Sequence, residues 1–512
     1  MTQQGSSGMS APVDTSAGIP MLNEISRHGR RGLRFAGSGE EASLPERYVR
    51  NTTDVLALPE VSELDVVRHF TRLSQRNMSI DTTFYPLGSC TMKYNPKVNE
   101  AVASARGFAE THPLTPNLQA QGSLALMFEL QELLAAVSGM AAVSLQPAAG
   151  AQGELAGIMI MRAYHAARND QRRTRVLVPD SAHGTNPATV RMAGYDAVQI
   201  PSDSEGLVDQ SALEAVCGDD IAGLMLTNPN TLGLFERNID RVAETVHSCG
   251  GLVYGDGANL NAILGVLRPG DVGIDIMHFN LHKTFSTPHG GGGPGSGPVG
   301  VRQDLADFLP GPIVVADSES TGGRQTNDEV PGESGTPTYR LAMPPKSIGR
   351  LKAFHGNFGM MVRAYAYIRM LGGPGLRRVA ENAVLNANYL MQLLSDVFPS
   401  RFKHTCMHEF VCPGNRIPGV STMDVAKRLL DYGFHAPTVY FPLIVRDALM
   451  VEPTESENCE TLEAFSAALH AIAREAVDHP ELLHSAPSSL PVSRLDEVEA
   501  VKRLKLTWQD TA

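Results

Sequence analysis

Residues 141–283 alternate short apolar segments with helical patterns, and this alternation constrains the fold more than any other feature of the chain. The apolar segments are AAVSLQP, RVLVPD, AVQIP, GLMLTNP, GLVYGD and DIMHFNLHK. Helical periodicity appears between them, for example in GELAGIMIMRAYHAARN and ERNIDRVAETVH. Nearly continuous apolar strands separated by helices predict an α/β fold with a mostly parallel sheet that helices cover on both faces. Ligands of such a sheet bind at the carboxyl ends of the strands.

The remaining sequence predicts further parts on either side of this sheet. We expect an N-terminal arm and tail, in which Ser62 and Asp65 form the capping box of a short helix. A long helical pattern later in the chain ends at a Gly-Gly-Pro stop. The predicted parts are the arm at 1–84, a large domain at 85–345, a connecting helix at 346–374 and a small α+β C-terminal domain at 375–512.

Composition excludes several classes of protein. The chain has 512 residues, of which 42% are apolar and 19% charged, enough for several domains with a large core. Its net charge of −12 argues against a nucleic-acid-binding protein and against a basic membrane-surface protein. No apolar run is long enough for a transmembrane helix, and the first residues lack the pattern of a signal peptide. The six cysteines form no disulfide framework, so we expect a cytoplasmic protein.

Lys283 follows the last apolar segment and precedes a glycine-dense turn, in NLHKTFSTPHGGGGPG. A lysine at a strand end, beside hydroxyl groups and flexible backbone, suits a Schiff base with a phosphorylated aldehyde. The alternative is an ordinary surface lysine ahead of a linker, and this window alone does not separate the two.

Two further strand ends carry groups that such a cofactor needs. Asp256 suits the protonated pyridinium nitrogen of pyridoxal phosphate (PLP), and Ala258 is small enough for the ring to pack against it. The alternative role of Asp256 is to cap the next helix. His183, in PDSAHGTNPA, has a flat ring that can stack on the cofactor, although a loop histidine is more often an ordinary polar residue.

The turn QPAAGAQGE and the segment TNPNTLG complete the set of strand ends. Backbone amides of Gly150, Ala151 and Gln152 at a helix N-terminus suit a phosphate, in a motif that is neither a Walker A loop nor GxGxxG. Asn228 and Thr231 are candidates to bind the phenolate oxygen of the cofactor, with an ordinary Asn-Pro turn as the alternative.

Together these motifs resemble the fold-type-I PLP-dependent enzymes, and in particular the glycine decarboxylase (P-protein) of the glycine cleavage system. Within that family the chain is most similar to the C-terminal-half subunit of the two-subunit bacterial form. The resemblance covers nearly all of the chain from about residue 85 onward. It rests on the strings FYPLGSCTMKYNP, SLQPAAGAQGE, DSAHGTNPA, LTNPNTLGLFE, GDGANLNA, NLHKTFSTPHGGGGPG, GNFG and MVEPTESE.

The resemblance implies roles for individual residues. Lys283 would carry PLP, Asp256 would pair with the ring nitrogen and His183 would stack on the ring. The resemblance also implies an active-site loop of Ser89, Cys90, Thr91 and Lys93, with His112 nearby.

The implied activity is that of an oxidoreductase of glycine catabolism. It would decarboxylate glycine and transfer the aminomethyl group to the lipoyl arm of a carrier, the H-protein. The implied partners are this carrier and a sibling subunit that resembles the N-terminal half of P-protein, in an α₂β₂ assembly. Another fold-type-I PLP lyase and a non-catalytic partner half stay as alternatives, although a degenerate half would be expected to have lost Lys283.

Two cysteine-containing segments raise separate hypotheses. His404, Cys406 and His408 alternate, so a strand would place them on one face as half of a metal site or in a core. We expect the core, and no metal, because no second ligand pair accompanies them. Cys90 would be reactive if a nearby positive charge such as Lys93 favoured its thiolate.

Overall fold

The computed structural model describes residues 18–33, 45–48, 58–290, 295–317, 337–402, 404–414, 419–504 and 506. Internal contacts divide the chain into two units, one of residues 83–486 and one of residues 1–82 with 487–512. The predicted domain boundaries stay predictions, but these contacts group residues 487–512 with the N-terminal unit. No helix in the described part of the chain has the length and apolar character needed to cross a membrane.

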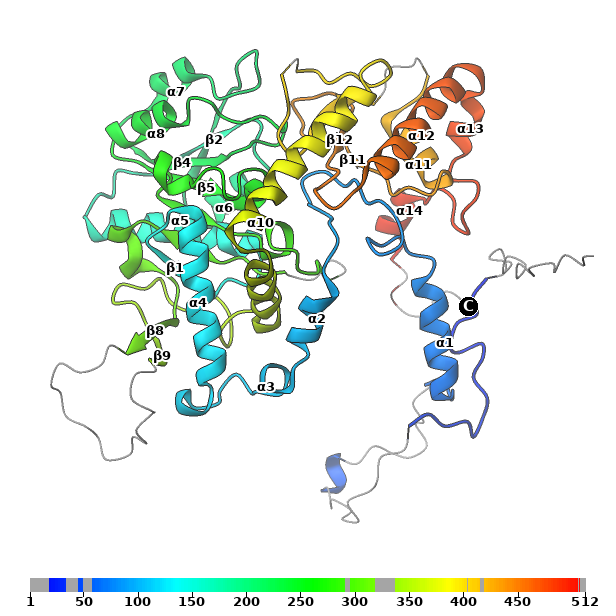
Figure 1. The fold of residues 1–512 in the computed structure, drawn as a ribbon, viewed down its shortest axis with the longest axis horizontal. Coiled ribbons are helices and arrows are strands. Elements are labelled where there is room, and N and C mark those ends of the chain that lie inside the picture. The colour runs from blue at the N-terminus through cyan, green and yellow to red at the C-terminus, as the bar shows by residue number, and fades with distance from the viewer. Residues whose placement is uncertain are drawn as a thin grey trace, which may run out of the picture. The chain divides into compact units, whose positions relative to one another are not determined.

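A seven-stranded sheet in the order β1-β7-β6-β5-β4-β2-β3 organises the larger unit (Figure 1). Strands β3, β2, β4, β5 and β6 pair in parallel, and β7 runs antiparallel between β1 and β6. The predicted mostly parallel sheet is therefore confirmed. The strands are β1 Ala142–Ser144, β2 Arg175–Pro179, β3 Asp196–Ile200, β4 Ile221–Thr227, β5 Leu252–Asp256, β6 Ile276–His278 and β7 Val299–Val301.

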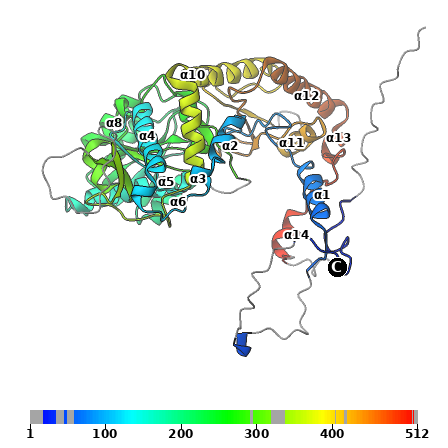
Figure 2. The ribbon, with the colours of Figure 1, turned by 60° about the horizontal axis from the view of Figure 1, so that its bottom comes forward.

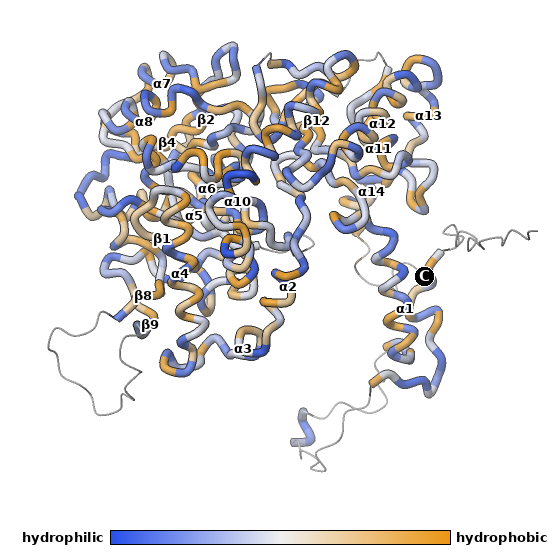
Figure 3. Tube along the Cα trace, viewed as in Figure 1, coloured by the Kyte–Doolittle hydropathy of each residue, from blue (hydrophilic) through white to orange (hydrophobic). Residues whose placement is uncertain are grey.

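Helices cover both faces of this sheet because neighbouring residues of each buried strand face opposite ways. In β4, Leu224 packs into one hydrophobic cluster and Met225 into another. Figure 3 shows hydrophobic segments concentrated around the sheet and the helices beside it. The helices of this part are α2 Lys97–Ala103, α3 Arg106–Ala109, α4 Gln121–Ser138, α5 Gly150–Ala167, α6 Thr185–Met192, α7 Gln210–Val216, α8 Ile239–Ser248 and α9 Leu281–Thr284. Short 3-10 helices are η2 Asn117–Gln119, η3 Gly257–Ala262, η4 Pro269–Val272 and η5 Gln303–Phe308.

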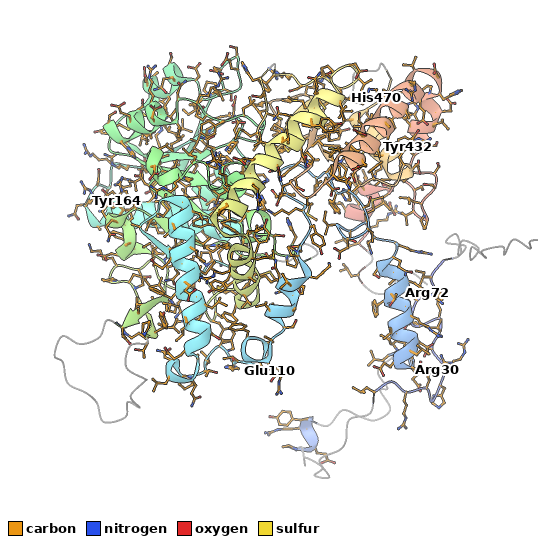
Figure 4. The ribbon with its side chains drawn as sticks, in the orientation of Figure 1. Arg30, Arg72, Glu110, Tyr164, Tyr432 and His470 are labelled. Atoms are coloured by element: carbon orange, nitrogen blue, oxygen red, sulfur yellow. The ribbon has the colours of Figure 1, made fainter. Side chains whose placement is uncertain are left out.

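A second, three-stranded antiparallel sheet in the order β10-β12-β11 lies later in the same unit. Helices α11 and α12 are joined by Glu475, which accepts from Arg428 Nε at 2.9 Å and from the Tyr432 hydroxyl at 2.8 Å. Figure 4 labels Tyr432 beside these helices. The elements are β10 Phe410–Pro413, β11 Thr438–Val439, β12 Ala448–Val451, α11 Thr422–Asp431, α12 Cys459–Asp478 and α13 Pro480–Ser485. Strands β8 Ile313–Asp317 and β9 Thr338–Ala342 form a separate two-stranded sheet.

Helix α10 differs from the predicted connecting helix. It spans Phe358–Leu393, so it begins later than expected and continues past the predicted stop. Gly372, with φ 60° and ψ 179°, is not helical, and Pro374 follows it, so the chain breaks at the predicted Gly-Gly-Pro stop and a second helical segment continues beyond the kink. Figure 2 shows α10 changing direction between its end beside α4 and its end beside α12.

The smaller unit contains the predicted capped helix. Helix α1 is Glu63–Ser74, and the capping box of Ser62 and Asp65 is present. The other elements of this unit are η1 Glu46–Tyr48 and α14 Glu497–Lys502. Residues 1–17, 34–44 and 49–57 of the expected arm and tail lie outside the described residues.

Gly157 lets α5 approach the sheet, and replacing it by alanine should destabilise the protein. An added Cβ would lie 2.4 Å from Cε2 of the buried Tyr254 ring. We expect Gly157→Ala to lower the free energy of unfolding by about 1–3 kcal/mol, as overpacking does. The matched control is Gly122→Ala in α4, where an added Cβ meets nothing within 4 Å. Urea unfolding followed by circular dichroism measures both variants, and equal midpoints would contradict the prediction.

Candidate active site

A cavity of about 230 Å³ lies at the carboxyl ends of the parallel strands. It adjoins Thr227 and Asp256, the last residues of β4 and β5, and His278, the last residue of β6. This is the edge at which the sequence predicts the site. Of the predicted residues, the cavity brings together Ser89, Gly150, Ala151, His183, Thr231, Asp256, Ala258 and Lys283.

Lys283 reaches this cavity from α9, the short helix that directly follows β6. Its backbone N–H donates to the Asn280 carbonyl at 3.0 Å, which holds the helix against the strand end. Two histidines of the same segment stay neutral near it. Burial, and then the charge of Lys283, lowers the pKa of His282 to about 3 and that of His289 to about 4. The lysine is therefore surrounded by imidazoles that add no positive charge.

Asp256 is buried, and its carboxylate is held by donors on both oxygens. Oδ1 accepts from the Ala258 backbone N–H at 2.9 Å, and Oδ2 accepts from Asn186 Nδ2 at 3.2 Å. Burial opposes ionisation, but the nearby His278, the Ala258 N–H, Lys283 and Asn186 together lower the pKa of Asp256 below its ordinary value. Asp256 thus caps η3, as the alternative interpretation proposed, and also faces the cavity as a stabilised anion.

His183 lies in the turn between β2 and α6, with its ring exposed to the cavity. Its Nδ1 is 2.9 Å from the Thr185 hydroxyl, and its ring makes an edge contact with Phe441 at a centroid distance of 5.4 Å. Burial lowers the pKa of His183, so the imidazole is neutral near neutral pH. Glu154 also borders the cavity and was not singled out in the sequence, although the string SLQPAAGAQGE contains it.

The turn before α5 fits a phosphate group. The helix begins at Gly150, and the first N–H groups of a helix lack intrahelical partners and attract anions. A Cβ on Gly150 would lie 2.3 Å from Asn280 Oδ1, so only glycine leaves this approach open. The Gln152 side chain points elsewhere, because Oε1 accepts from the Ala148 N–H at 2.6 Å and Nε2 donates to the Leu351 carbonyl at 2.9 Å. Only its backbone N–H remains a candidate phosphate ligand.

Some predicted residues are not brought into the cavity. Asn228 lies beside β4, and its Oδ1 accepts from the Glu236 N–H at 2.9 Å. Asn259 and Asn280 line the cavity in its place, together with Thr231. His112 borders a different cavity of about 480 Å³.

The predicted active-site loop is held by two buried glutamates that sequence reasoning missed. The Ser89 N–H donates to Glu409 Oε2 at 2.7 Å, and the Thr91 N–H and hydroxyl donate to the two oxygens of Glu452 at 3.0 and 2.6 Å. Ser89 and Thr91 have positive φ angles of 64° and 47°, a backbone conformation that residues other than glycine rarely adopt. Burial raises the pKa of both glutamates, and a neighbouring carboxylate adds to the rise, Glu452 for Glu409 and Glu455 for Glu452. These hydrogen bonds therefore fix the strained loop beside Lys283.

Lys93, the last predicted member of the loop, is buried and turned toward α9. Its Nζ donates to the Thr284 carbonyl at 2.9 Å and pairs with Glu455 Oε1 at 2.8 Å. The proposed activation of Cys90 by Lys93 is therefore wrong. Burial raises the pKa of the Cys90 thiol, and the cation that opposes this rise is Lys283.

The alternation of His404, Cys406 and His408 does not form a strand, because β10 begins only at Phe410. His404 is half-buried, Cys406 lies in the hydrophobic core of the second sheet, and His408 is buried. A different group, His408, Glu409 and Glu452, has ligand atoms within 4.8 Å of one another, but its two carboxylates already accept the loop hydrogen bonds.

Comparisons with known proteins identify the family. The model of the glycine dehydrogenase C-terminal domain matches residues 379–486. A probable glycine dehydrogenase (decarboxylating) subunit 2 from Caldanaerobacter subterraneus is 54% identical over 95% of this chain and 98% of its own length. One with the same name from Thermotoga petrophila is 52% identical over 95% of this chain and 99% of its own length. The chain belongs to the glycine dehydrogenase (decarboxylating) subunit 2 family. The predicted resemblance is confirmed.

Solved structures confirm the fold of this family member. A glycine decarboxylase (P-protein) of the glycine cleavage system, in inhibitor-bound form, superposes with a TM-score of 0.69 at 23% identity, covering 84% of this chain and 93% of that one. Glutamate decarboxylase from Lactobacillus brevis superposes with a TM-score of 0.60 at 13% identity, covering 86% and 97%. The fold is that of the fold-type-I PLP-dependent enzymes, as predicted, and the glycine-lined turn, Asp256 and Lys283 fit that cofactor.

Removing the carboxylate that holds Thr91 should destabilise the subunit. Glu452→Ala leaves the buried N–H and hydroxyl of Thr91 without their acceptor, at about 1–3 kcal/mol for each unsatisfied group. Glu452→Gln is the control, since its amide oxygen can accept from the N–H while its NH₂ donates to the hydroxyl. Urea unfolding midpoints should fall clearly for alanine and little for glutamine. An alanine variant as stable as the wild type would contradict the assigned contact.

Cys90 should react slowly with thiol reagents. Its thiol is largely buried with a raised pKa, whereas Cys459 is exposed at the start of α12 and serves as an internal control. Because the thiolate is the reactive form, we expect Cys459 to be alkylated well before Cys90 at neutral pH. Peptide mass mapping over a time course of iodoacetamide treatment measures both. Faster labelling of Cys90 would show that its environment is wrongly assigned.

Proposed function

We propose that this chain is the PLP-carrying subunit that decarboxylates glycine and transfers the aminomethyl group to the lipoyl arm of a carrier, the H-protein. The observation that supports it is the convergence of Lys283, Asp256 and His183 in one cavity, in a chain that is 54% identical to a subunit 2 relative along nearly its whole length. The family, and the decarboxylating activity that the family name states, are inferred from this sequence identity. The roles of individual residues are proposals that the resemblance implies and that the geometry of the cavity supports.

Bound PLP supplies an electron sink that accepts the electron pair left when the substrate carboxylate departs. Among the protein groups, Lys283 is the residue whose amine would hold the cofactor covalently. Asp256 is an ionised, fixed anion, so it suits the protonated ring nitrogen of the cofactor and stabilises positive charge there. The Gly150–Ala151 turn suits the phosphate, with the dipole of α5 directed at it.

His183 and the loop at Ser89 complete the site as we propose it. The exposed face of the His183 ring is available to stack on the cofactor ring. The strained loop from Ser89 to Thr91 borders the same cavity and is anchored from behind by Glu409 and Glu452. A rigid loop at this position excludes water and orients groups before reaction, which is how positioning lowers a barrier.

We also propose the partners and the compartment that the family implies. The name "subunit 2" of the relatives supports a sibling subunit, and an α₂β₂ assembly in the cytoplasm follows from the resemblance to the two-subunit P-protein. The lipoylated H-protein would receive the product of the reaction at this assembly.

Replacing Lys283 tests the cofactor assignment. The wild-type chain should turn yellow with PLP, and borohydride should fix the pyridoxyl group on the peptide that contains Lys283. Lys283→Ala should lose this covalent label and lower glycine decarboxylation at least about 100-fold, because it removes the nucleophilic amine. Lys283→Arg is the matched control, which keeps the charge but does not form the covalent bond. Labelling at another lysine would overturn the assignment.

A second assay separates the proposed activity from its alternatives. The chain is combined with the sibling subunit, lipoylated H-protein and carboxyl-labelled glycine, and release of labelled carbon dioxide is measured. Release that depends on H-protein supports the proposal. Covalent PLP with turnover of another amino acid instead of glycine would favour a different fold-type-I lyase. Failure to bind PLP even with the sibling subunit would favour a non-catalytic partner half.

A further inference from the structure

Glu154, Thr185 and His183 form a continuous hydrogen-bonded path at the wall of the active-site cavity. The Thr185 hydroxyl donates to Glu154 Oε1 at 2.9 Å, and the same hydroxyl oxygen lies 2.9 Å from His183 Nδ1. The three residues come from different elements: Glu154 from α5, Thr185 from the first position of α6, and His183 from the turn before it. We infer that Glu154, acting through Thr185, sets which ring nitrogen of His183 carries the imidazole proton.

The surroundings of Glu154 leave only one of its oxygens free to change its hydrogen-bonding role. Oε2 accepts from Asn186 Nδ2 at 3.0 Å, a group that can only donate, and makes a longer contact of 3.4 Å with the Thr189 hydroxyl. Oε1 faces Thr185, whose hydroxyl can either donate or accept. A proton taken up by Glu154 is therefore best placed on Oε1, where it points at Thr185.

Glu154 is suited to change protonation in the neutral range. It is 5% exposed, and Asn186 Nδ2 bridges it to Asp256, so two carboxylates share one donor. Burial and the charge of Asp256 raise the pKa of Glu154 to about 7. Tyr254 also faces it from β5, its hydroxyl hydrogen-bonded to His278 of β6, and Lys283 of α9 borders the same cavity.

Each state of Glu154 specifies one tautomer of the neutral His183. When Glu154 is ionised it can only accept, so the Thr185 hydroxyl donates to it and accepts from Nδ1–H, which leaves Nε2 without a proton. When Glu154 is protonated, its O–H donates to Thr185 and the Thr185 hydroxyl donates to Nδ1, so the imidazole proton resides on Nε2. The net change is one proton bound by Glu154 from solvent, and the imidazole exchanges its own proton between nitrogens through water.

A second contact favours the tautomer of His183 that ionised Glu154 disfavours. The Thr185 backbone N–H lies 3.3 Å from His183 Nδ1 and favours an unprotonated Nδ1. Without the charge on Glu154, or without the hydroxyl that transmits it, this N–H should hold the Nε2–H tautomer at every pH. Glu154 is thus a positioning residue: it determines whether Nε2, the ring nitrogen outside this path, donates or accepts a hydrogen bond in the cavity.

The test measures the tautomer directly in the full chain without cofactor, substrate or partner. Histidine is labelled with ¹⁵N, and the His183 signals are assigned by comparison with His183→Asn. Protonated and unprotonated ring nitrogens differ widely in ¹⁵N shift, so both tautomers are recognised. Spectra are taken at intervals from pH 6 to pH 8.5, a range that brackets the pKa of Glu154 at about 7.

Three variants separate the path from a purely structural role. In the wild type we expect Nε2–H at pH 6 and Nδ1–H at pH 8.5, with a midpoint near pH 7. Thr185→Ser keeps the hydroxyl and should keep this change, whereas Thr185→Val should show Nε2–H throughout. Glu154→Gln should also show Nε2–H throughout, because Asn186 and Thr189 bind the amide oxygen and turn its NH₂ toward Thr185.

The outcomes are decisive without any assay of turnover. A wild-type tautomer that does not change with pH overturns the inference, and so does a pH-dependent change that persists in Thr185→Val or Glu154→Gln. Circular dichroism confirms that each variant is folded before its spectrum is interpreted. The meaning of the tautomer for glycine chemistry rests on the proposed function, but a failed decarboxylation assay leaves these spectra unaffected. The two hypotheses therefore fail independently.

Discussion

A carboxylate buried at the end of β5 imposes the arrangement of the polar groups around it. Burying a charge costs several kcal/mol unless donors and opposite charges compensate it. Asp256 accepts hydrogen bonds from the Ala258 N–H and from Asn186 Nδ2. The His278 imidazole lies nearby, and the positive charge of Lys283 also favours the ionised carboxylate. These compensating groups come from η3, α6, β6 and α9, so the charge requires the ends of neighbouring elements to meet at one place. The cavity that Asp256 and Lys283 line lies at that meeting point.

The same constraint explains which parts of the site could be predicted from the sequence. In a parallel sheet, residues that end successive strands are brought together whatever lies between them, so the convergence of Asp256, His183 and Lys283 follows from the strand pattern. Asn228 shows the limit of this argument. Thr227 ends β4 and faces the cavity, and because neighbouring residues of an extended chain point to opposite sides, the next residue faces away. A sequence motif does not show which of two neighbouring residues faces the cavity.

The features that could not be predicted depend on partners far away in the chain or on a context that local rules do not contain. Glu154, Glu409 and Glu452 are isolated carboxylates in the sequence, and only the folded chain shows that they are buried beside donors. The second helical segment after the Gly-Gly-Pro sequence was not predicted for a related reason. The backbone leaves the helical conformation at Gly372 as predicted, but the residues beyond it resume a helix that packs against α12, so α10 is two helical segments joined at a kink.

The anchoring of the loop at Ser89 also has a consequence for how the protein is made. Its hydrogen bonds join residues 320 and 361 positions apart, from Ser89 to Glu409 and from Thr91 to Glu452. Contacts between residues so far apart in the sequence form late in folding. The chain between them must first lose conformational entropy, and only then do the contacts stabilise the fold. During synthesis the sheet and Lys283 emerge well before either glutamate. A nascent chain therefore carries Lys283 in an unfinished pocket, and only about the last fifth of the polypeptide closes it.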